Sequence, residues 1–201
     1  VGDYQIGSIA VRILEFGVGE LPKDFWKTRI AAAYSVRESL GLVTEENNTY
    51  RLIHGEGDFL PGLIVDIYAD TAVIQAHSVG MHYHREEIAE AIVEAVEQVD
   101  KVYYKSDDTL PHKAMIQGDR VGYLIGGNRV EDKEFWAKEN GLSFRIDWLR
   151  GQKTGFFIDQ RDNRALLEQY AKDKDVLNMF CYTGGFSVYA LRGGAKKVHS
   201  V

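Results

Sequence analysis

The chain has 201 residues, with 24 basic and 30 acidic side chains and a formal net charge of −6. Hydrophobic residues make up 45% and charged residues 27%, a composition that is ordinary for a globular protein and argues against long disordered tracts. We find no run of roughly 18 apolar residues and no basic-then-apolar leader, which disfavours a membrane span and a secretory signal. Cys181 is the single cysteine, so no internal disulfide can form, and a reduced, cytoplasmic protein is expected.

Residues 1–45 predict a strand followed by a helix. Residues 8–16 alternate in polarity and are rich in β-branched side chains, as strands are. Asp24 can cap a helix that continues at helical spacing to Gly41. We expect this part to be the end of an N-terminal region with a linking helix, bounded by the polar segment 45–49.

Residues 46–149 predict a small α+β domain. Strands are expected at 50–53, 63–68, 72–77, 102–105 and 142–149, with an edge strand at 121–125. Residues 84–98 have the apolar spacing of an amphipathic helix. Residues 113–139 otherwise carry few signals.

Residues 150–201 read as the start of a doubly wound α/β sheet. A helix is expected at 162–171, then an almost fully apolar strand at 176–180, a glycine turn, a second helix and a strand ending the chain. Two strands and one crossover helix cannot cover a parallel sheet. We therefore expect a piece of a longer protein, with apolar strand surface exposed and a tendency of copies to self-associate.

The turn after the apolar strand is the first candidate site. Gly184 and Gly185 let backbone N–H groups and a helix N-terminus approach a ligand. Phe186 and Tyr189 stand where a dinucleotide-binding turn has glycines, and the phosphate-binding P-loop pattern is absent. A neutral or zwitterionic ligand is favoured, and the alternative is a glycine pair that only makes a tight turn.

The second candidate is the motif GQKTGFFIDQRDNR at residues 151–164. Asp159 can accept a hydrogen bond from an ammonium or hydroxyl group, and Arg161 can bind a carboxylate or phosphate with two hydrogen bonds. In the alternative interpretation Asp159 or Asp162 caps the following helix, while Arg161 and Arg164 are solvated.

These two motifs, with VLNMFCYTGGFSVYALRGGAKKVHSV, resemble the class I S-adenosylmethionine-dependent methyltransferase domain of the ribosomal large subunit methyltransferase I family. That family makes 5-methylcytosine in 23S ribosomal RNA. GEGDFLPGLIVDIYAD is similar to the family's central domain, and FGVGELPKDFWKTRI resembles the stretch after its N-terminal PUA domain. The resemblance implies a Rossmann-like fold that is truncated here, ribosomal RNA as partner and S-adenosylmethionine as cofactor.

The resemblance also implies which residues contact the cofactor. The first cofactor motif of the family, around the methionine part, matches Asn178, Phe180, Tyr182, Thr183, Gly184, Gly185 and Phe186. The preceding motif, which closes the pocket, matches Phe157, Asp159, Gln160 and Arg161.

The implied mechanism is covalent. A cysteine thiolate attacks carbon 6 of cytosine, carbon 5 takes the methyl group, and a base removes its proton. In the family the catalytic cysteine, its Asp-Pro-Pro motif and the ribose-binding acid lie downstream of the position of Val201. The 201 residues alone are therefore expected to be inactive, and Cys181 is interpreted as a small packing residue.

RNA contact and metal binding have weaker signals. Arg12, Lys27 and Arg29 place basic groups near Trp26 on the first strand and helix, a combination that suits RNA, although Trp26 is equally a core residue. The histidines of HYHREE, at 82 and 84, open a predicted helix without an assignable third ligand. We interpret them as a solvated helix start and expect no metal.

The sequence thus predicts a parent protein that methylates cytosine carbon 5 in 23S ribosomal RNA. Two alternatives stay open: a methyltransferase that acts on another RNA base or on a protein, and a non-catalytic RNA-binding module.

Overall fold

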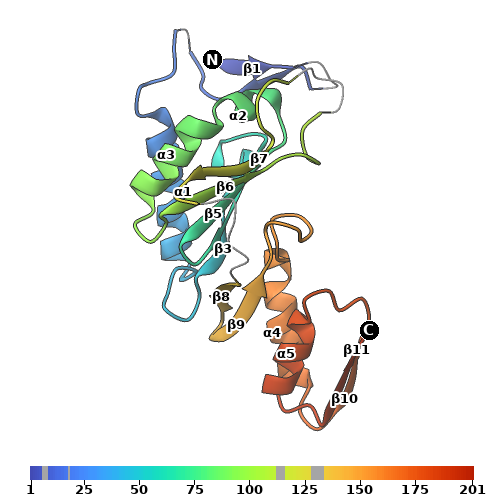
Figure 1. Ribbon diagram of the computed structural model, residues 1–201. Coiled ribbons are helices and arrows are strands. Elements are labelled where there is room, and N and C mark those ends of the chain that lie inside the picture. Colours follow the sequence, from blue (N-terminus) through green and yellow to red (C-terminus); the bar gives the residue numbers. More distant parts are fainter. Residues whose placement is uncertain (6–8, 18, 112–115, 128–133) are drawn as a thin grey trace. The chain divides into compact units, whose positions relative to one another are not determined.

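The computed structural model describes residues 1–5, 9–17, 19–111, 116–127 and 134–201 (Figure 1). The chain divides into two compact units, Val1–Lys133 and Glu134–Val201, which are described separately. Residues 1–45 thus share a unit with the five-stranded sheet described below, and residues 134–149 share one with the glycine turn. The three predicted segments (1–45, 46–149 and 150–201) stay a prediction about domain organisation.

The first unit is built on a five-stranded mixed sheet. Its strands, in spatial order, are β3 (Thr49–His54), β4 (Leu63–Tyr68), β5 (Thr71–Ala76), β6 (Lys101–Lys105) and β7 (Val121–Ile125). β5 and β6 are parallel, and the other neighbours are antiparallel. Helices α2 (Val79–Tyr83) and α3 (Arg85–Ala95) make the crossover that a parallel pair requires.

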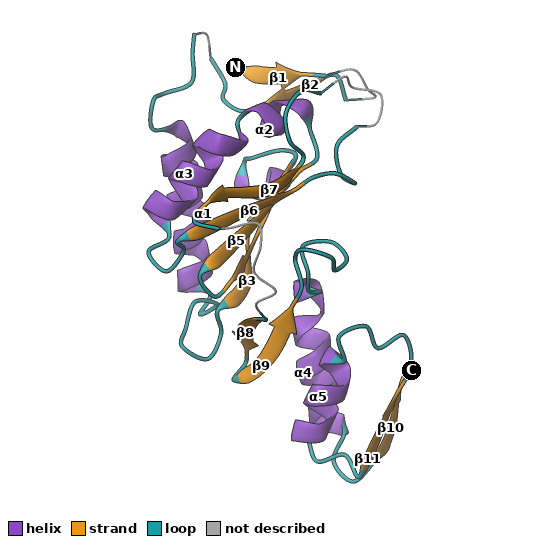
Figure 2. Cartoon of the chain, in the orientation of Figure 1, coloured by secondary structure: helices purple, strands orange, loops and turns teal. Residues whose placement is uncertain are grey.

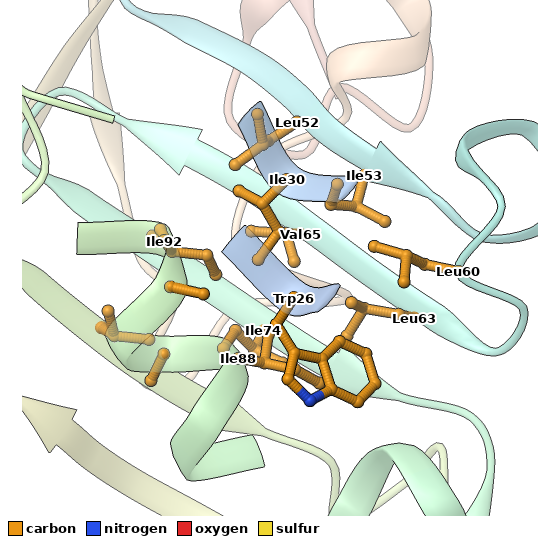
Figure 3. Packing of buried hydrophobic residues seen from close by; sticks show 14 of the residues in the cluster. Trp26, Ile30, Leu52, Ile53, Leu60, Leu63, Val65, Ile74, Ile88 and Ile92 are labelled. Atoms are coloured by element: carbon orange, nitrogen blue, oxygen red, sulfur yellow. The ribbon is translucent and has the colours of Figure 1, made fainter. Parts of the chain in front are cut away.

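Helix α1 (Phe25–Ser39) contacts α3, and Figure 2 shows both helices on one face of this sheet. Apolar side chains meet between the helices and the sheet (Figure 3). Ile30 of α1, Ile74 of β5 and Ile92 of α3 are all fully buried. Removal of this apolar surface from water is the main force that holds the first unit together.

The start of the chain differs in part from the prediction. Strands β1 (Gly2–Tyr4) and β2 (Val11–Ile13) pair in antiparallel fashion, so the strand expected at 8–16 is shorter, and Ser8 lies outside the described residues. α1 begins where predicted. However, Asp24 makes no side-chain cap, since its carboxylate accepts from the Thr28 hydroxyl at 3.4 Å.

The helix predicted at 84–98 is α3, which begins at Arg85 and ends earlier than predicted, at Ala95. α2 is additional, and the Ser78 hydroxyl caps it by accepting from the Met81 N–H at 3.3 Å. α3 ends at Ala95 because Val96 has extended backbone angles, φ −121° and ψ 93°.

The second unit begins with an antiparallel hairpin of β8 (Phe135–Glu139) and β9 (Leu142–Ile146). β8 was not predicted, for a physical reason. Its inner face presents Ala137 and the acidic Glu139, whereas Trp136 faces outward and is 55% exposed. The apolar–polar alternation that predicts a strand is therefore scrambled.

The remaining elements of this unit are a short turn of helix η2 (Ile158–Gln160), α4 (Arg161–Tyr170), β10 (Asp175–Asn178), α5 (Gly185–Arg192) and β11 (Lys197–Ser200). β10 and β11 are parallel and α5 joins them, which confirms the predicted βαβ unit and the mixed α/β fold.

The strand predicted at 176–180 is β10, which is shorter and ends at Asn178. Leu177 is 61% exposed and Phe180 91% exposed, because this sheet has only two strands. The expected exposure of apolar strand surface is confirmed.

Candidate cofactor site

A cavity of about 650 Å³ lies in the second unit. Two segments provide most of its lining, one before and at the start of α4 and the other from the end of β10 to the start of α5. Its lining residues are Gln152, Phe156, Phe157, Gln160, Arg164, Phe180, Cys181, Tyr182, Thr183, Gly185, Phe186 and Val201. The structure therefore brings the two candidate motifs together around one space.

Most of the predicted cofactor residues line this cavity: Phe157, Gln160, Phe180, Tyr182, Thr183, Gly185 and Phe186. Gly184 is next to it, as the N-cap of α5. Asp159, Arg161 and Asn178 are not among the lining residues. Their roles toward a cofactor stay predictions.

The residues outside the lining have other partners. Asp159 is exposed and accepts a hydrogen bond from the Gln160 amide at 3.3 Å. The Arg161 Nε lies 3.4 Å from the Glu139 carboxylate. Asn178 donates to the Ser187 hydroxyl at 2.8 Å, which ties the end of β10 to α5.

The turn between β10 and α5 has an unusual backbone. Phe180, Tyr182 and Gly184 all adopt left-handed conformations, with φ of 58°, 48° and 76°. Such angles are costly for residues other than glycine and gather at functional sites. A hydrogen bond of 2.7 Å from the Gly184 N–H to the Cys181 carbonyl closes the turn.

Tyr182 joins the two motifs. Its hydroxyl accepts from the Gln152 N–H at 3.0 Å, and its ring packs edge-on against Phe157 with centroids 5.1 Å apart. The Tyr182 side chain therefore links the two segments that line the cavity.

The two glycines have different reasons to be glycine. A Cβ on Gly184 would meet nothing within 4 Å, so this residue serves the left-handed turn. A Cβ on Gly185 would lie 3.1 Å from the Cδ of Arg164. Gly185 thus makes room for a buried side chain, which spacing alone does not reveal.

Arg164, which lines the cavity, and its hydrogen-bond partner Glu139 were not predicted as site residues. Arg164 is 2% exposed and Glu139 is fully buried, which excludes the alternative in which Arg164 is solvated. Neither Asp159 nor Asp162 caps α4, whose N-cap, Gln160, also makes no side-chain cap. A buried acid in a stretch of weak strand pattern gives no sequence signal.

Cys181 lies on the cavity wall with its side chain partly exposed, and its interpretation as a small packing residue stays a prediction. Its backbone N–H donates to the Val201 carbonyl at 2.9 Å.

The interpretation of His82 as part of a solvated helix start is wrong. His82 is fully buried in α2, with ring nitrogens 2.7 Å from the Tyr104 hydroxyl and 2.8 Å from the Gln117 carbonyl. Burial lowers the pKa of His82 and raises that of Tyr104 to about 12. His84 is partly exposed beside Trp26, with ring centroids 4.9 Å apart.

The three cations proposed for RNA contact have different surroundings. Lys27 forms an ion pair with Glu94, and Arg29 forms one with Glu15 at 2.8 Å. The Nε and Nη1 atoms of Arg12 are buried and have no hydrogen-bond partner among the described residues. Trp26 is 7% exposed, which supports the alternative that it is a core residue.

Metal-binding clusters and membrane-spanning helices are both absent from the described part of the chain. It contains no group of three or more His, Cys, Asp or Glu side chains placed to hold a metal ion. None of its helices combines the length and the apolar character of a membrane span.

A family model for S-adenosylmethionine-dependent methyltransferases matches residues 50–201, which include both cavity motifs. The chain belongs to this methyltransferase family. The predicted cofactor of the family, S-adenosylmethionine, is confirmed by the same match.

Curated relatives of this methyltransferase chain carry the name that the sequence suggested. A protein named ribosomal RNA large subunit methyltransferase I, from Tolumonas auensis, is 41% identical over 96% of the chain and 48% of its own length. Its namesake from Vibrio cholerae is 38% identical over 94% of the chain and 47% of its own length. The chain thus spans about half the length of these curated relatives.

Solved structures agree with this family. "A putative sam-dependent methyltransferase from Streptococcus mutans" superposes with a TM-score of 0.78 at 26% identity, over 95% of this chain and 48% of that one. A second methyltransferase structure, complexed with SAH, gives a TM-score of 0.79 at 25% identity, over 100% of this chain and 49% of its own.

Proposed function

We propose that the full-length protein transfers a methyl group from S-adenosylmethionine to carbon 5 of a cytosine in 23S ribosomal RNA. The cavity in which the two motifs meet carries this proposal. The similarity to proteins named ribosomal RNA large subunit methyltransferase I supports the choice of substrate.

The cavity residues fit this cofactor. The volume of about 650 Å³ is in the usual range for small-molecule sites. α5 begins at Gly185 on the cavity wall, and the first N–H groups of a helix have no partner within it, so they suit a carboxylate. The aromatic side chains of Phe157 and Phe186 provide a wall that attracts a sulfonium cation. When bound, S-adenosylmethionine supplies the electrophilic methyl group.

The test uses the full-length protein, cofactor with a labelled methyl group, and ribosomal RNA. We expect label in 5-methylcytosine after digestion to nucleosides. Label in another base, or in protein, would support the first alternative and replace cytosine as the target. Failure to bind SAH in calorimetry would support the non-catalytic module.

The 201-residue chain alone is proposed to bind the cofactor weakly and to transfer no methyl group. The resemblance assigns the nucleophile and the ribose-binding acid to sequence beyond these residues. Calorimetry with SAH should therefore give a much weaker affinity for the 201-residue chain than for the full-length protein. Equal affinities would contradict this proposal.

RNA contact through Arg12, Lys27 and Arg29 is proposed for the first unit, with a cytoplasmic location for the whole protein. Replacement of all three cations by glutamine should weaken binding to ribosomal RNA and flatten its salt dependence. An unchanged salt slope would place the RNA surface elsewhere.

Self-association of the 201-residue chain is proposed through its exposed apolar residues. Leu177, Met179 and Phe180 are 61%, 53% and 91% exposed at one end of the short sheet. Sedimentation at increasing concentration should show dimers or larger species, and a Leu177→Lys variant should show fewer. A strictly monomeric wild type would refute this.

A further inference from the structure

A buried ion pair connects three segments of the second unit. Glu139, the last residue of β8, is fully buried and accepts from the Nε and Nη2 of Arg164 at 2.8 and 2.7 Å. The Tyr189 hydroxyl of α5 donates to the same carboxylate at 2.9 Å. Burial and the Glu139 charge raise the pKa of Tyr189, so this hydroxyl keeps its proton and stays a donor.

Arg164 also contacts both walls of the cavity. Its Nη1 donates to the Phe157 carbonyl at 3.0 Å, and its guanidinium lies over the Phe156 ring, 4.6 Å from the centroid. On the other wall its Cδ occupies the space next to Gly185. One planar guanidinium therefore fixes how far the Phe156–Phe157 segment lies from the start of α5.

We propose that Arg164, held in place by Glu139, is a positioning residue of the cofactor cavity. Arg164 sets the separation of the two walls, and Glu139 acts through Arg164 by neutralising its charge and fixing the plane of its guanidinium. This inference rests on the proposed function, because it assigns the cavity to the cofactor.

The ion pair between Arg164 and Glu139 suits the positioning of the cavity walls better than an apolar contact would. A buried ion pair often adds little stability compared with apolar residues of similar size, but it is satisfied in only one geometry. The guanidinium of Arg164 donates two hydrogen bonds to the Glu139 carboxylate and one to the Phe157 carbonyl. A lysine has one ammonium group and cannot reach these acceptors together.

Arg192 provides a matched control for Arg164, because it links helices α4 and α5 of the same unit. Arg192 of α5 donates to the Glu168 carboxylate of α4 with two bonds of 2.6 Å, and it also donates to the Asn140 carbonyl in the hairpin. Arg192 is not among the residues that line the cavity. It links the same elements as Arg164 without contact to the cavity walls.

The experiment compares Arg164→Lys, Glu139→Gln and Arg192→Lys in the full-length protein. Three quantities are measured: the Kd for SAH by calorimetry, the unfolding temperature, and amide hydrogen exchange in residues 156–161 and 182–188. Loss of charge-assisted hydrogen bonds at Arg164 or Glu139 should raise the Kd about tenfold and speed exchange in both segments. Arg192→Lys should change the Kd by less than about twofold, even where it lowers the unfolding temperature.

A purely structural role would give a different result. If Arg164→Lys lowers the unfolding temperature but leaves the Kd and the exchange rates as in Arg192→Lys, the inference is wrong and the proposed function stands. If the wild type does not bind SAH, the proposed function fails, and the exchange rates alone decide whether Arg164 holds the walls. Should Arg164→Lys not fold, Glu139→Gln and Tyr189→Phe carry the same comparison.

Discussion

The described residues contain two parallel strand pairs that differ in burial. In the first unit β5 and β6 pair in register Thr71↔Lys101, and every residue of β5 is buried. In the second unit β10 and β11 pair in register Asp175↔Lys197, yet Leu177 is 61% exposed. Both pairs are joined by helices, and both contain apolar residues. The difference shows that an apolar strand is buried only where neighbouring strands and helices cover it.

The largest expected effect tests this difference directly. Ile74→Ala, in the middle of the five-stranded sheet, should lower the free energy of unfolding by about 2–5 kcal/mol because it leaves a cavity in a packed core. Leu177→Ala should change it by less than about 0.5 kcal/mol in the 201-residue chain. Urea unfolding of both variants measures the change in the free energy of unfolding. Similar losses would show that Leu177 is covered in solution, for example by a second copy.

The turns that follow β5 and β10 sharpen the comparison. The first is closed by the Ser78 side chain at the start of α2, and the second by the left-handed backbone of Gly184. Gly184→Ala should cost about 1–2 kcal/mol of stability through backbone strain alone. Ser78→Ala should cost about 1 kcal/mol through the lost cap. Thermal unfolding checks both, and a neutral Gly184→Ala would mean that the turn relaxes.

A smaller effect concerns pH in the first unit. Because burial holds the pKa of His82 below its ordinary value of 6.5, the unfolded chain binds more protons than the folded one as the pH falls. The His82 contribution to stability should be full above about pH 6.5 and decline at lower pH. The pKa of His77 is also lowered by burial, so its contribution to stability should likewise decline as the pH falls.

The measurement is the unfolding temperature between about pH 7.5 and pH 5.5. We expect a decrease that is shallower in His82→Gln and in His77→Gln. Parallel curves for the wild type and both variants would assign the decrease to other groups.

The smallest effect is expected on the surface of α1. Lys27 and Glu94 form an ion pair with side chains 50% and 58% exposed. Lys27→Ala should change the free energy of unfolding by less than about 0.5 kcal/mol, since such pairs are well solvated. A loss above 1 kcal/mol in urea unfolding would show that Lys27 has a structural role that its exposure conceals.

Much of the fold was predictable from local patterns. The strands at 63–68 and 121–125 were predicted with the bounds that the structure has, and α1 begins next to the predicted Asp24. The predictions failed where side chains break the local pattern. Glu139 on the inner face of β8 and His82 in α2 are polar residues at buried positions, so periodicity could not identify their elements.

The candidate site, like the fold, was predictable where it depends on local sequence and not where it depends on distant contacts. Residues of contiguous motifs, such as Phe157, Tyr182 and Gly185, were predicted and line the cavity. Arg164 was dismissed as solvated in one interpretation, because its partner Glu139 is 25 residues away on a strand that the sequence did not predict. Asp159 belongs to the predicted motif but is exposed, since a position in a motif does not fix the direction of a side chain.

The sequence by itself determined the methyltransferase family, the βαβ unit and the two motifs that surround the cavity. These depend on residue types at fixed spacing, which local backbone preferences translate directly into turns, strands and helices. Only the tertiary structure decided that Glu139 and Arg164 form a buried pair and that Gly185 leaves room for Arg164. Each of these depends on which distant segments meet, because burial and charge pairing are properties of the packed chain.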